Sequence, residues 1–320
     1  MSVIDRSPAA REVPVAAPAS SGPPSLGIRR THYVALRCPD PAAAAAFAAE
    51  WMGFDHVHAD ADGVQYLAAH GLDPYSLVYT PGDAGLDHVS YLVADLAQLD
   101  RAAAQLDAAG VAYERVERSP LWRHEPALRF RTPSGHLIEL APGVDVEAPM
   151  AALVSRPEAV PGPICCDHVM PRCVEADAEM AFASGPFGLR QSSQVDAPGV
   201  GAIMGFYRCR TLYHCYAVAR SSRNGLHHVQ FTLKDAPAVF AAHAQMSQAG
   251  GVEIVWGPVR HGPGHNVAFY FRDHVGNVVE YSAEEEVILA DDSYAPQHWS
   301  VADQRAHDEW GSRPPAEFAQ

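Results

Sequence analysis

The sequence has no apolar run of the length, about 18 residues or more, that a membrane-spanning helix needs. Its opening stretch, MSVIDRSPAAREVPVAAPASSGPPS, contains no continuous apolar core, so we expect no secretory signal peptide. The six cysteines include no C-x-x-C pair, and without an export signal we expect reduced thiols in a cytoplasmic protein. Positive charge is also scarce. The formal net charge of -15 argues against nucleic acid or an anionic membrane as a partner.

Two proline-rich stretches divide the chain. Residues 1–28 are rich in Pro, Ala and Ser without a hydrophobic period, which indicates a disordered arm. A second stretch, 154–164, is predicted to be an interdomain linker. These boundaries predict an N-terminal domain over 29–153, a C-terminal domain over 165–285, and a C-terminal tail over 286–320.

The chain repeats itself internally. The segment that starts at Leu86 aligns without a gap with the segment that starts at Leu226. The paired residues include His88 and His228, Val89 and Val229, Asp95 and Asp235, Gln105 and Gln245, and Gly110 and Gly250. Two weaker copies open with THYVALRC at Thr31 and CDHVMPRC at Cys166. We therefore expect four modules of about 55 residues each, two per domain.

Each module is predicted to contain a strand, a helix and then two or three strands. HHVQFTL alternates as a strand does. Asp235 is placed to cap a helix over APAVFAAHAQMSQA, which would end at Gly250. VEIVW, NVAFYFR and NVVEYS follow as strands, the last two joined by the turn DHVGN. The predicted fold class is α+β, with four βαβββ modules in two domains.

Strand phase separates the two adjacent histidines of GLHHVQF. Alternate side chains of a strand point to opposite faces. His227 falls on the apolar face, so we expect it at the packing edge under the helix. His228 falls on the polar face, which is predicted to line a cavity. The repeat agrees, because His88 aligns with His228 while Asp87 takes the place of His227.

Both domains contain two histidines and a glutamate at similar intervals. They are His32, His88 and Glu139 in the first domain, and His168, His228 and Glu280 in the second. Two imidazoles and one carboxylate on one face of a metal form the facial triad of non-haem iron(II) oxygenases. Such a triad leaves up to three positions open, enough for a chelating substrate and dioxygen together.

With these motifs the sequence resembles the vicinal oxygen chelate superfamily, and its two-domain arrangement resembles the type I extradiol catechol dioxygenases. The resemblance covers about residues 30–285 and is strongest in the second domain. It implies the vicinal oxygen chelate fold and a metal site at His168 in CDHVM, His228 in HHVQF and Glu280 in VVEYS. It implies Fe(II) as the metal, with Mn(II) as the alternative, and O2 as co-substrate.

The same resemblance implies roles for further residues. His214, in LYHCYAVA, matches the acid–base residue of the family. The stretch VRHGPGHNVAFYF matches a family motif that assigns His261 and Tyr270 to hydrogen bonding with a substrate oxygen. The candidate substrate-binding residues are Phe206, Trp256 and His265.

The activity that the resemblance implies is extradiol, or meta, cleavage of a catechol-type ring, giving a 2-hydroxymuconic semialdehyde-type product. Trp256 stands near the place where homoprotocatechuate-type members carry an arginine for a substrate carboxylate, which favours an uncharged or aryl-substituted catechol. The tail, 286–320, resembles tails that fold over the pocket, with a strap between domains or subunits as the alternative. We also expect a homo-oligomer.

The first-domain triad lacks the acid–base partners of the second. Ser76 sits near the place of His214, and Arg129 takes the place of Tyr270. A triad without these partners is either a relic or a structural metal site, and we favour the relic.

Three other functions fit the same scaffold. A glyoxalase-like isomerase would build its site from two modules with a second glutamate, which His168 argues against. A 4-hydroxyphenylpyruvate-type dioxygenase would need the triad but not His214, His261 and Tyr270. A binding protein of the bleomycin-resistance kind would sequester its ligand without a metal.

Overall fold

The computed structural model describes residues 25–117, 121, 126–143, 162–290 and 293–319. The predicted arm and linker lie mostly outside these residues. The first strand begins at Ile28, and the second domain opens with a strand at Cys165.

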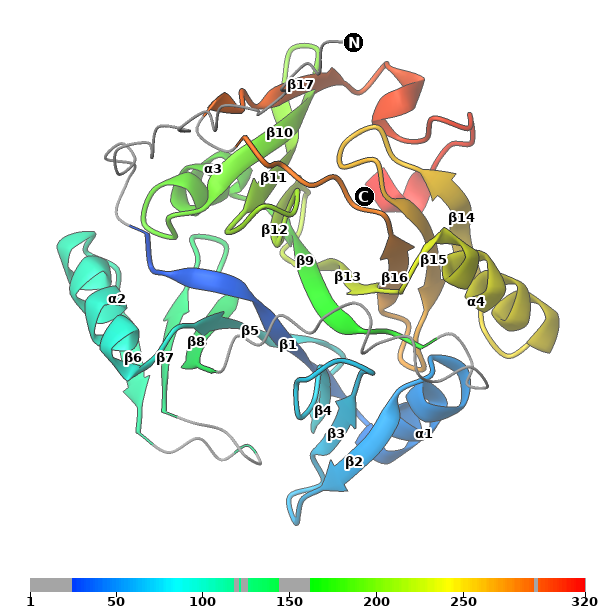
Figure 1. Ribbon diagram of the computed structural model, residues 1–320, viewed down its shortest axis with the longest axis horizontal. Helices are drawn as coiled ribbons and strands as arrows, with labels where there is room; N and C mark the ends of the chain where they lie inside the picture. Colours follow the sequence, from blue (N-terminus) through cyan, green and yellow to red (C-terminus); the bar gives the residue numbers. More distant parts are fainter. Residues whose placement is uncertain (1–24, 118–120, 122–125, 144–161, 291–292, 320) are drawn as a thin grey trace, which may run out of the picture.

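The first domain consists of two modules, each with a strand, a helix and three strands (Figure 1). The first module contains β1 (Ile28–Cys38), α1 (Pro41–Trp51), β2 (Asp55–Ala59), β3 (Gln65–Ala68) and β4 (Leu77–Pro81). The second contains β5 (Gly85–Val93), α2 (Leu96–Ala108), β6 (Tyr113–Val116), β7 (Ala127–Arg131) and β8 (Leu137–Pro142).

The second domain repeats this order and adds a tail. Its third module contains β9 (Cys165–Cys173), α3 (Ala176–Ser184), β10 (Arg190–Ala197), β11 (Gly201–Arg208) and β12 (Tyr216–Arg220). Its fourth contains β13 (Gly225–Thr232), α4 (Ala236–Ala249), β14 (Ile254–Arg260), β15 (Val267–Arg272) and β16 (Val278–Ala283). The tail carries β17 (Gln297–Ser300) and the 3-10 helices η3 (Gln304–Ala306) and η4 (Ala316–Ala319). The α+β class and the four predicted βαβββ modules are confirmed.

The strands form one mixed sheet in each domain. The strand orders are β2-β3-β4-β1-β5-β8-β7-β6 and β14-β15-β16-β13-β9-β12-β11-β10-β17. The first strands of the two modules are antiparallel neighbours at the centre, β1 beside β5 and β9 beside β13. In each module that first strand pairs in parallel with the last. This topology places β9, β13 and β16 side by side.

Local sequence signals define the ends of the elements in the fourth module. The Asp235 side chain accepts a hydrogen bond from the Ala238 amide at 2.9 Å and caps α4, as predicted. The helix ends at Gly250, whose φ of 68° lies in the left-handed region that glycine adopts without strain. The Asp273 carboxylate accepts from the Asn277 amide at 2.8 Å and holds the turn between β15 and β16.

One hydrophobic core joins the two domains. Phe54 of the first domain and Phe231 of β13 both belong to it, with their ring centroids 5.0 Å apart. The central strand β1 packs against β9 of the other domain (Figure 1). A buried hydrogen bond crosses the boundary from the Tyr91 hydroxyl to the Cys215 carbonyl, 3.2 Å apart. The two domains therefore form one packed unit.

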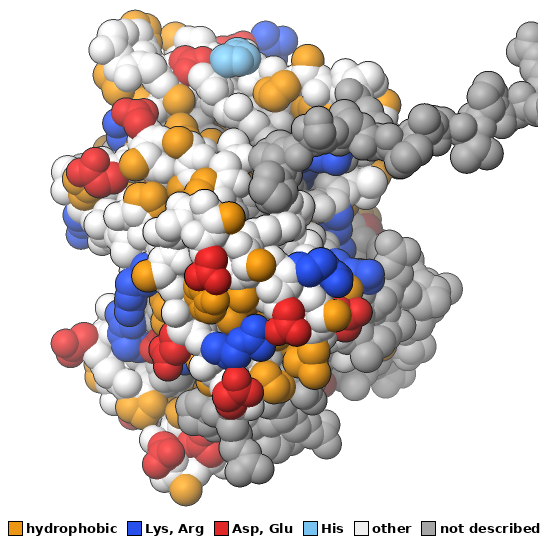
Figure 2. All heavy atoms as spheres, turned by 90° about the vertical axis from the view of Figure 1, so that its left-hand side faces the viewer, with side chains coloured by type: hydrophobic (Ala, Val, Ile, Leu, Met, Phe, Trp, Pro, Cys, Tyr) orange, Lys and Arg blue, Asp and Glu red, His pale blue; other side chains and the backbone are white. Residues whose placement is uncertain are grey.

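All six cysteines lie in the described part of the chain, and none of them forms a disulfide in the structure. No helix among the described residues is long and apolar enough to cross a membrane. The face shown in Figure 2 intersperses acidic, basic and hydrophobic side chains.

Candidate metal centre and active site

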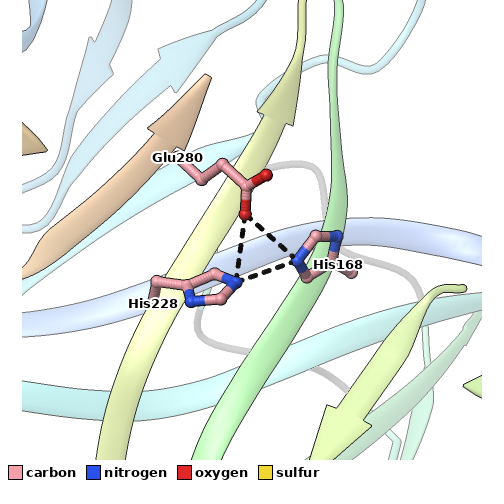
Figure 3. A group of neighbouring side chains, drawn as sticks. All are labelled: His168, His228 and Glu280. Carbon is pink, nitrogen blue, oxygen red and sulfur yellow. Dashed lines mark hydrogen bonds and ion pairs between the residues drawn. The ribbon is translucent and has the colours of Figure 1, made fainter. Parts of the chain in front are cut away.

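Three neighbouring strands bring the predicted metal ligands together. His168 lies on β9, His228 on β13 and Glu280 on β16, and their side chains point toward one another (Figure 3). The Nε2 atoms of the two histidines are 3.0 Å apart. Oε2 of Glu280 lies 3.1 Å from Nε2 of His228 and 3.6 Å from Nε2 of His168. No other group of three potential ligands gathers this closely in the described residues.

The spacing of these three atoms fits one metal ion. Metal–ligand bonds of about 2.1 Å at right angles place neighbouring donor atoms about 3 Å apart. The separations of 3.0, 3.1 and 3.6 Å are therefore close to those of three ligands on one face of an octahedral ion. Two imidazoles and one carboxylate form a donor set that suits a divalent first-row transition metal.

Burial sets the protonation of the three residues. It lowers the pKa of both His168 and His228 well below the usual imidazole value, which favours the neutral form that binds metals. Burial raises the pKa of the Glu280 carboxyl, and the nearby His261 and His214 partly oppose this. A bound cation would favour the ionised carboxylate, which is the form that binds metals.

Asn266 orients the carboxylate, although we did not predict this residue. Its Nδ2 donates to Oε1 of Glu280 at 3.0 Å, which leaves Oε2 facing the two histidines. Asn266 stands directly before β15, where an asparagine is also an ordinary loop residue. The sequence pattern therefore gave no signal that separated it from its neighbours.

His261 and Tyr270 form a hydrogen-bonded pair beside the triad. The His307 carbonyl lies 2.7 Å from Nδ1 of His261 and can only accept, so Nδ1 carries the hydrogen. Nε2 of His261 then accepts from the Tyr270 hydroxyl at 2.8 Å. Tyr270 lies opposite Glu280 in the β15–β16 ladder. Burial raises the pKa of Tyr270 well above its usual value, so the phenol keeps its proton.

His214 lies against the metal ligands on another side. Its ring centroid is 3.9 Å from that of His168. Oε1 of Glu285 lies 2.6 Å from Nδ1 of His214 and also accepts from its backbone amide at 3.1 Å. Burial lowers the pKa of the His214 imidazole. We did not predict Glu285, because only the fold distinguishes it from its neighbours in a run of three glutamates.

The triad opens into a cavity of about 250 Å³. Apolar side chains form much of its wall, among them Met170, Met204 and the predicted Phe206 and Trp256. The Phe206 ring lies 5.4 Å from that of His214, and Trp256 stacks on Tyr270 at 5.5 Å. Apolar walls with a few convergent polar groups are typical of a small-molecule site.

His265 does not join the other predicted residues. Its imidazole is nearly half exposed outside the cavity wall, and Nδ1 lies 3.3 Å from Oε1 of Glu309. Its φ of 53° turns the backbone at this point of the loop.

Residues of the tail close one side of the cavity. Val301, Ala306 and Phe318 line it. The tail is held in place by backbone contacts such as that from the Gly262 amide to the Arg305 carbonyl, 2.9 Å long. The described part of the tail thus forms part of the cavity wall.

The prediction for His227 was wrong. His227 also lines the cavity, and its ring centroid lies 4.9 Å from that of His228. The pairing of β13 with β9 shifts register between Leu226 and His228. Such an irregularity interrupts strict alternation, so two adjacent side chains can approach the same site.

The first domain holds its triad differently. The Arg129 guanidinium donates to Oε2 of Glu139 at 2.8 Å, and the Tyr33 hydroxyl donates to Oε1 at 2.7 Å. Tyr33 is also 2.9 Å from Nε2 of His88. His32 instead lies 3.8 Å from Asp73. Both oxygens of the Glu139 carboxylate thus accept hydrogen bonds from protein side chains. This favours the interpretation of the first-domain triad as a relic over a structural metal site.

Comparison with known proteins agrees with this architecture. Residues 86–142 match the family described as the catechol 2,3-dioxygenase-like N-terminal domain. Residues 166–281 match the Glyoxalase/Bleomycin resistance protein/Dioxygenase superfamily. Together the two matches span more than half of the chain.

Individual relatives extend over most of the chain. A metapyrocatechase of Pseudomonas sp. (strain CF600) is 28% identical over 260 residues, covering 78% of this chain and 84% of the relative. A manganese-dependent 2,3-dihydroxybiphenyl 1,2-dioxygenase of Geobacillus genomosp. 3 is 23% identical over 77% of this chain and 82% of its own. The crystal structure of homoprotocatechuate 2,3-dioxygenase from Arthrobacter globiformis has the same fold, with a TM-score of 0.80, 20% identity, and coverage of 94% and 92%. The chain therefore belongs to the Glyoxalase/Bleomycin resistance protein/Dioxygenase superfamily and, within it, to the extradiol dioxygenases.

Proposed function

We propose that this protein is an Fe(II)-dependent extradiol dioxygenase that cleaves a catechol-type ring beside its two hydroxyl groups. The observation that carries the proposal is the buried triad of His168, His228 and Glu280, which opens into a cavity shared with His214, His261 and Tyr270. Mn(II) is the alternative metal, since it takes the same donors and one relative is named as manganese-dependent.

The reaction balances without an external reductant. One carbon–carbon bond of the ring, next to the diol, breaks, and both atoms of O2 enter the 2-hydroxymuconic semialdehyde-type product. The ring carbons are oxidised and dioxygen is reduced. When bound, the metal would lower the pKa of a diol hydroxyl and help electrons pass from the substrate to dioxygen.

The residues around the triad suit the handling of protons and the orientation of the ring. His214 has Nδ1 beside Glu285, which leaves its Nε2 to exchange a proton with a reacting oxygen in the cavity. Tyr270 donates its proton to His261 close to Glu280, so the Tyr270 hydroxyl oxygen can accept a hydrogen bond from a substrate hydroxyl. The apolar walls exclude water around the ring.

The shape and chemistry of the cavity favour a catechol with an uncharged substituent. Met170, Met204 and Phe206 supply apolar surface on one side, and Trp256 stacks beside Tyr270 on another. Two arginines, Arg172 and Arg220, also lie in the wall, and the guanidinium of Arg220 is paired with Asp177. An alkyl or aryl group is the best match to the apolar part of the wall.

The test is anaerobic reconstitution with Fe(II), followed by a panel of catechols and admission of air. We expect a yellow ring-opened product and the uptake of one O2 per catechol. His228→Ala is the matched control and should lose both bound iron and activity. Iron-loaded protein that opens no ring in a broad panel would overturn the assignment.

The role of His214 is tested separately from metal binding. His214→Ala should keep its iron but turn over about 100-fold or more slowly, because a positioned general acid or base contributes about that much. Iron content and turnover are measured on the same sample. Loss of the metal in this variant would contradict the assigned role.

A further inference from the structure

His227 connects the metal ligand His228 to the C-terminal end of the chain. Its Nδ1 lies 2.8 Å from Nδ1 of His228, and its Nε2 lies 3.0 Å from the Phe318 carbonyl oxygen. His227 is only 4% exposed. These two contacts form a continuous hydrogen-bonded path from a backbone carbonyl in η4 to a residue of the triad.

The direction of each hydrogen bond in this path follows from donor chemistry. A carbonyl oxygen can only accept, so Nε2 of His227 carries the hydrogen. An imidazole that donates through Nε2 has, in its neutral tautomer, a bare Nδ1 that can only accept. The hydrogen between the two Nδ1 atoms must therefore belong to His228. With its hydrogen on Nδ1, His228 presents a bare lone pair at Nε2, the atom that faces His168 and Glu280.

We propose that His227, held by the Phe318 carbonyl, is a positioning residue that fixes His228 in its metal-binding tautomer. This inference rests on the metal site of the proposed function. A hydrogen on Nε2 of His228 would block metal binding. The hydrogen-bonded path through His227 disfavours that tautomer, because it requires the hydrogen on Nδ1. Nδ1 of His168 has no hydrogen-bond partner among the described residues, so the protein sets the tautomer of His228 in this way but not that of His168.

The same segment also packs on the active site. The Phe318 ring lies 5.1 Å from His227, 5.0 Å from Tyr270 and 5.7 Å from Trp256, measured between ring centroids. The Phe318 carbonyl thus hydrogen-bonds to His227, while the Phe318 ring packs against the cavity residues. Substitution of Phe318 removes only the ring, and truncation removes both. Metal affinity should depend on the carbonyl rather than on the ring.

The first experiment replaces His227 and measures Fe(II) affinity anaerobically by competition with a chelator. His227→Phe keeps a planar ring but cannot accept a hydrogen, and should weaken Fe(II) binding about 10- to 100-fold. His227→Gln offers an amide oxygen to His228 and an amide N–H to Phe318, and should stay within about threefold of the parent. Circular dichroism checks that each variant is folded. Equal affinity of the Phe variant and the parent would overturn the proposal.

The second experiment tests the carbonyl. Ending the chain at Pro315 removes it and should weaken Fe(II) binding as much as His227→Phe does, whereas Phe318→Ala keeps it and should bind nearly as the parent does. Combining the truncation with His227→Phe should add little, because both changes break one path. A loss in Phe318→Ala equal to that of the truncation would overturn the role of the carbonyl. A parent protein that binds no Fe(II) would instead overturn the proposed function itself.

Discussion

At the scale of single residues, burial decides which groups around the site carry charge. Glu285 is buried beside His214, and burial raises the pKa of its carboxyl to about 8. The neighbouring Asp167 is also buried, and its pKa is raised for the same reason. A carboxyl that is neutral at neutral pH can hold a proton close to His214, where an exposed glutamate could not.

The raised pKa of Glu285 predicts a pH dependence of stability. The folded protein keeps a proton that the unfolded chain releases above about pH 4.5, so the free energy of unfolding falls as pH rises toward 8. The slope from one such group is at most about 1.4 kcal/mol per pH unit. Glu285→Gln should flatten this slope, measured by denaturant unfolding of metal-free protein from pH 5 to 8.

A surface carboxylate provides the control for this measurement. Glu253 accepts a hydrogen bond from Arg272 at 3.1 Å but is largely exposed, so Glu253→Gln is the matched control for the effect of the substitution itself. If Glu285→Gln kept the slope of the parent, the carboxyl of Glu285 would not titrate as its burial requires.

At the scale of elements, one ladder position separates the two copies of the triad. Glu139 on β8 lies opposite Arg129 on β7, while Glu280 on β16 lies opposite Tyr270 on β15. A guanidinium supplies the positive charge that a buried carboxylate needs, and a phenol does not. In the first copy the protein itself thus supplies the compensating charge, whereas in the second the opposite ladder position supplies none.

This contrast predicts how the first copy responds to mutation. Arg129→Met leaves Glu139 buried without its cation and should lower the free energy of unfolding by about 3 kcal/mol. Adding Glu139→Gln removes the uncompensated charge and should recover most of the loss. Denaturant unfolding of both variants measures the two changes.

Two comparisons sharpen this test. Arg115→Met breaks the exposed ion pair with Asp100 and should change stability little. Iron content should stay at one ion per chain in all these variants. If the parent bound a second metal ion and the variant with Glu139→Gln lost it, the interpretation of the first-domain triad as a relic would be wrong.

At the scale of the whole molecule, the two domains are tied together by packing and by buried hydrogen bonds. The Tyr281 hydroxyl of β16 donates to the Met52 carbonyl, and Tyr79 of β4 donates to Asp273 beyond β15. Phe54 and Phe231 meet across the same boundary. These contacts join the main hydrophobic cores of the two domains into one.

We therefore expect the chain to unfold in one cooperative transition. Tyr281→Phe removes one buried interdomain hydrogen bond and should destabilise the whole protein by about 1 kcal/mol, because the carbonyl of Met52 loses its partner. Tryptophan fluorescence and far-UV circular dichroism should report the same midpoint before and after the change. Two separated transitions would show that the domains unfold independently.

Local signals in the sequence predict the modules and select the candidate metal ligands. Alternation in HHVQFTL, the Asp235 cap and the Gly250 stop are local signals, because each depends on residues that are neighbours along the chain. The internal repeat then selected His228, since His88 occupies the same place in the other copy. Such signals are readable because strand phase and helix capping depend on short-range backbone geometry.

The surroundings of those ligands, in contrast, follow from the packing of distant segments against one another. The register shift at Leu226 turned His227 into the cavity, and no alternation pattern reveals a shift that depends on the partner strand. Glu285 beside His214 and the Phe318 carbonyl beside His227 are separated from their partners by 71 and 91 residues. Their roles arise from burial and contact, which are fixed when the chain packs and are not encoded in the spacing of residues along it.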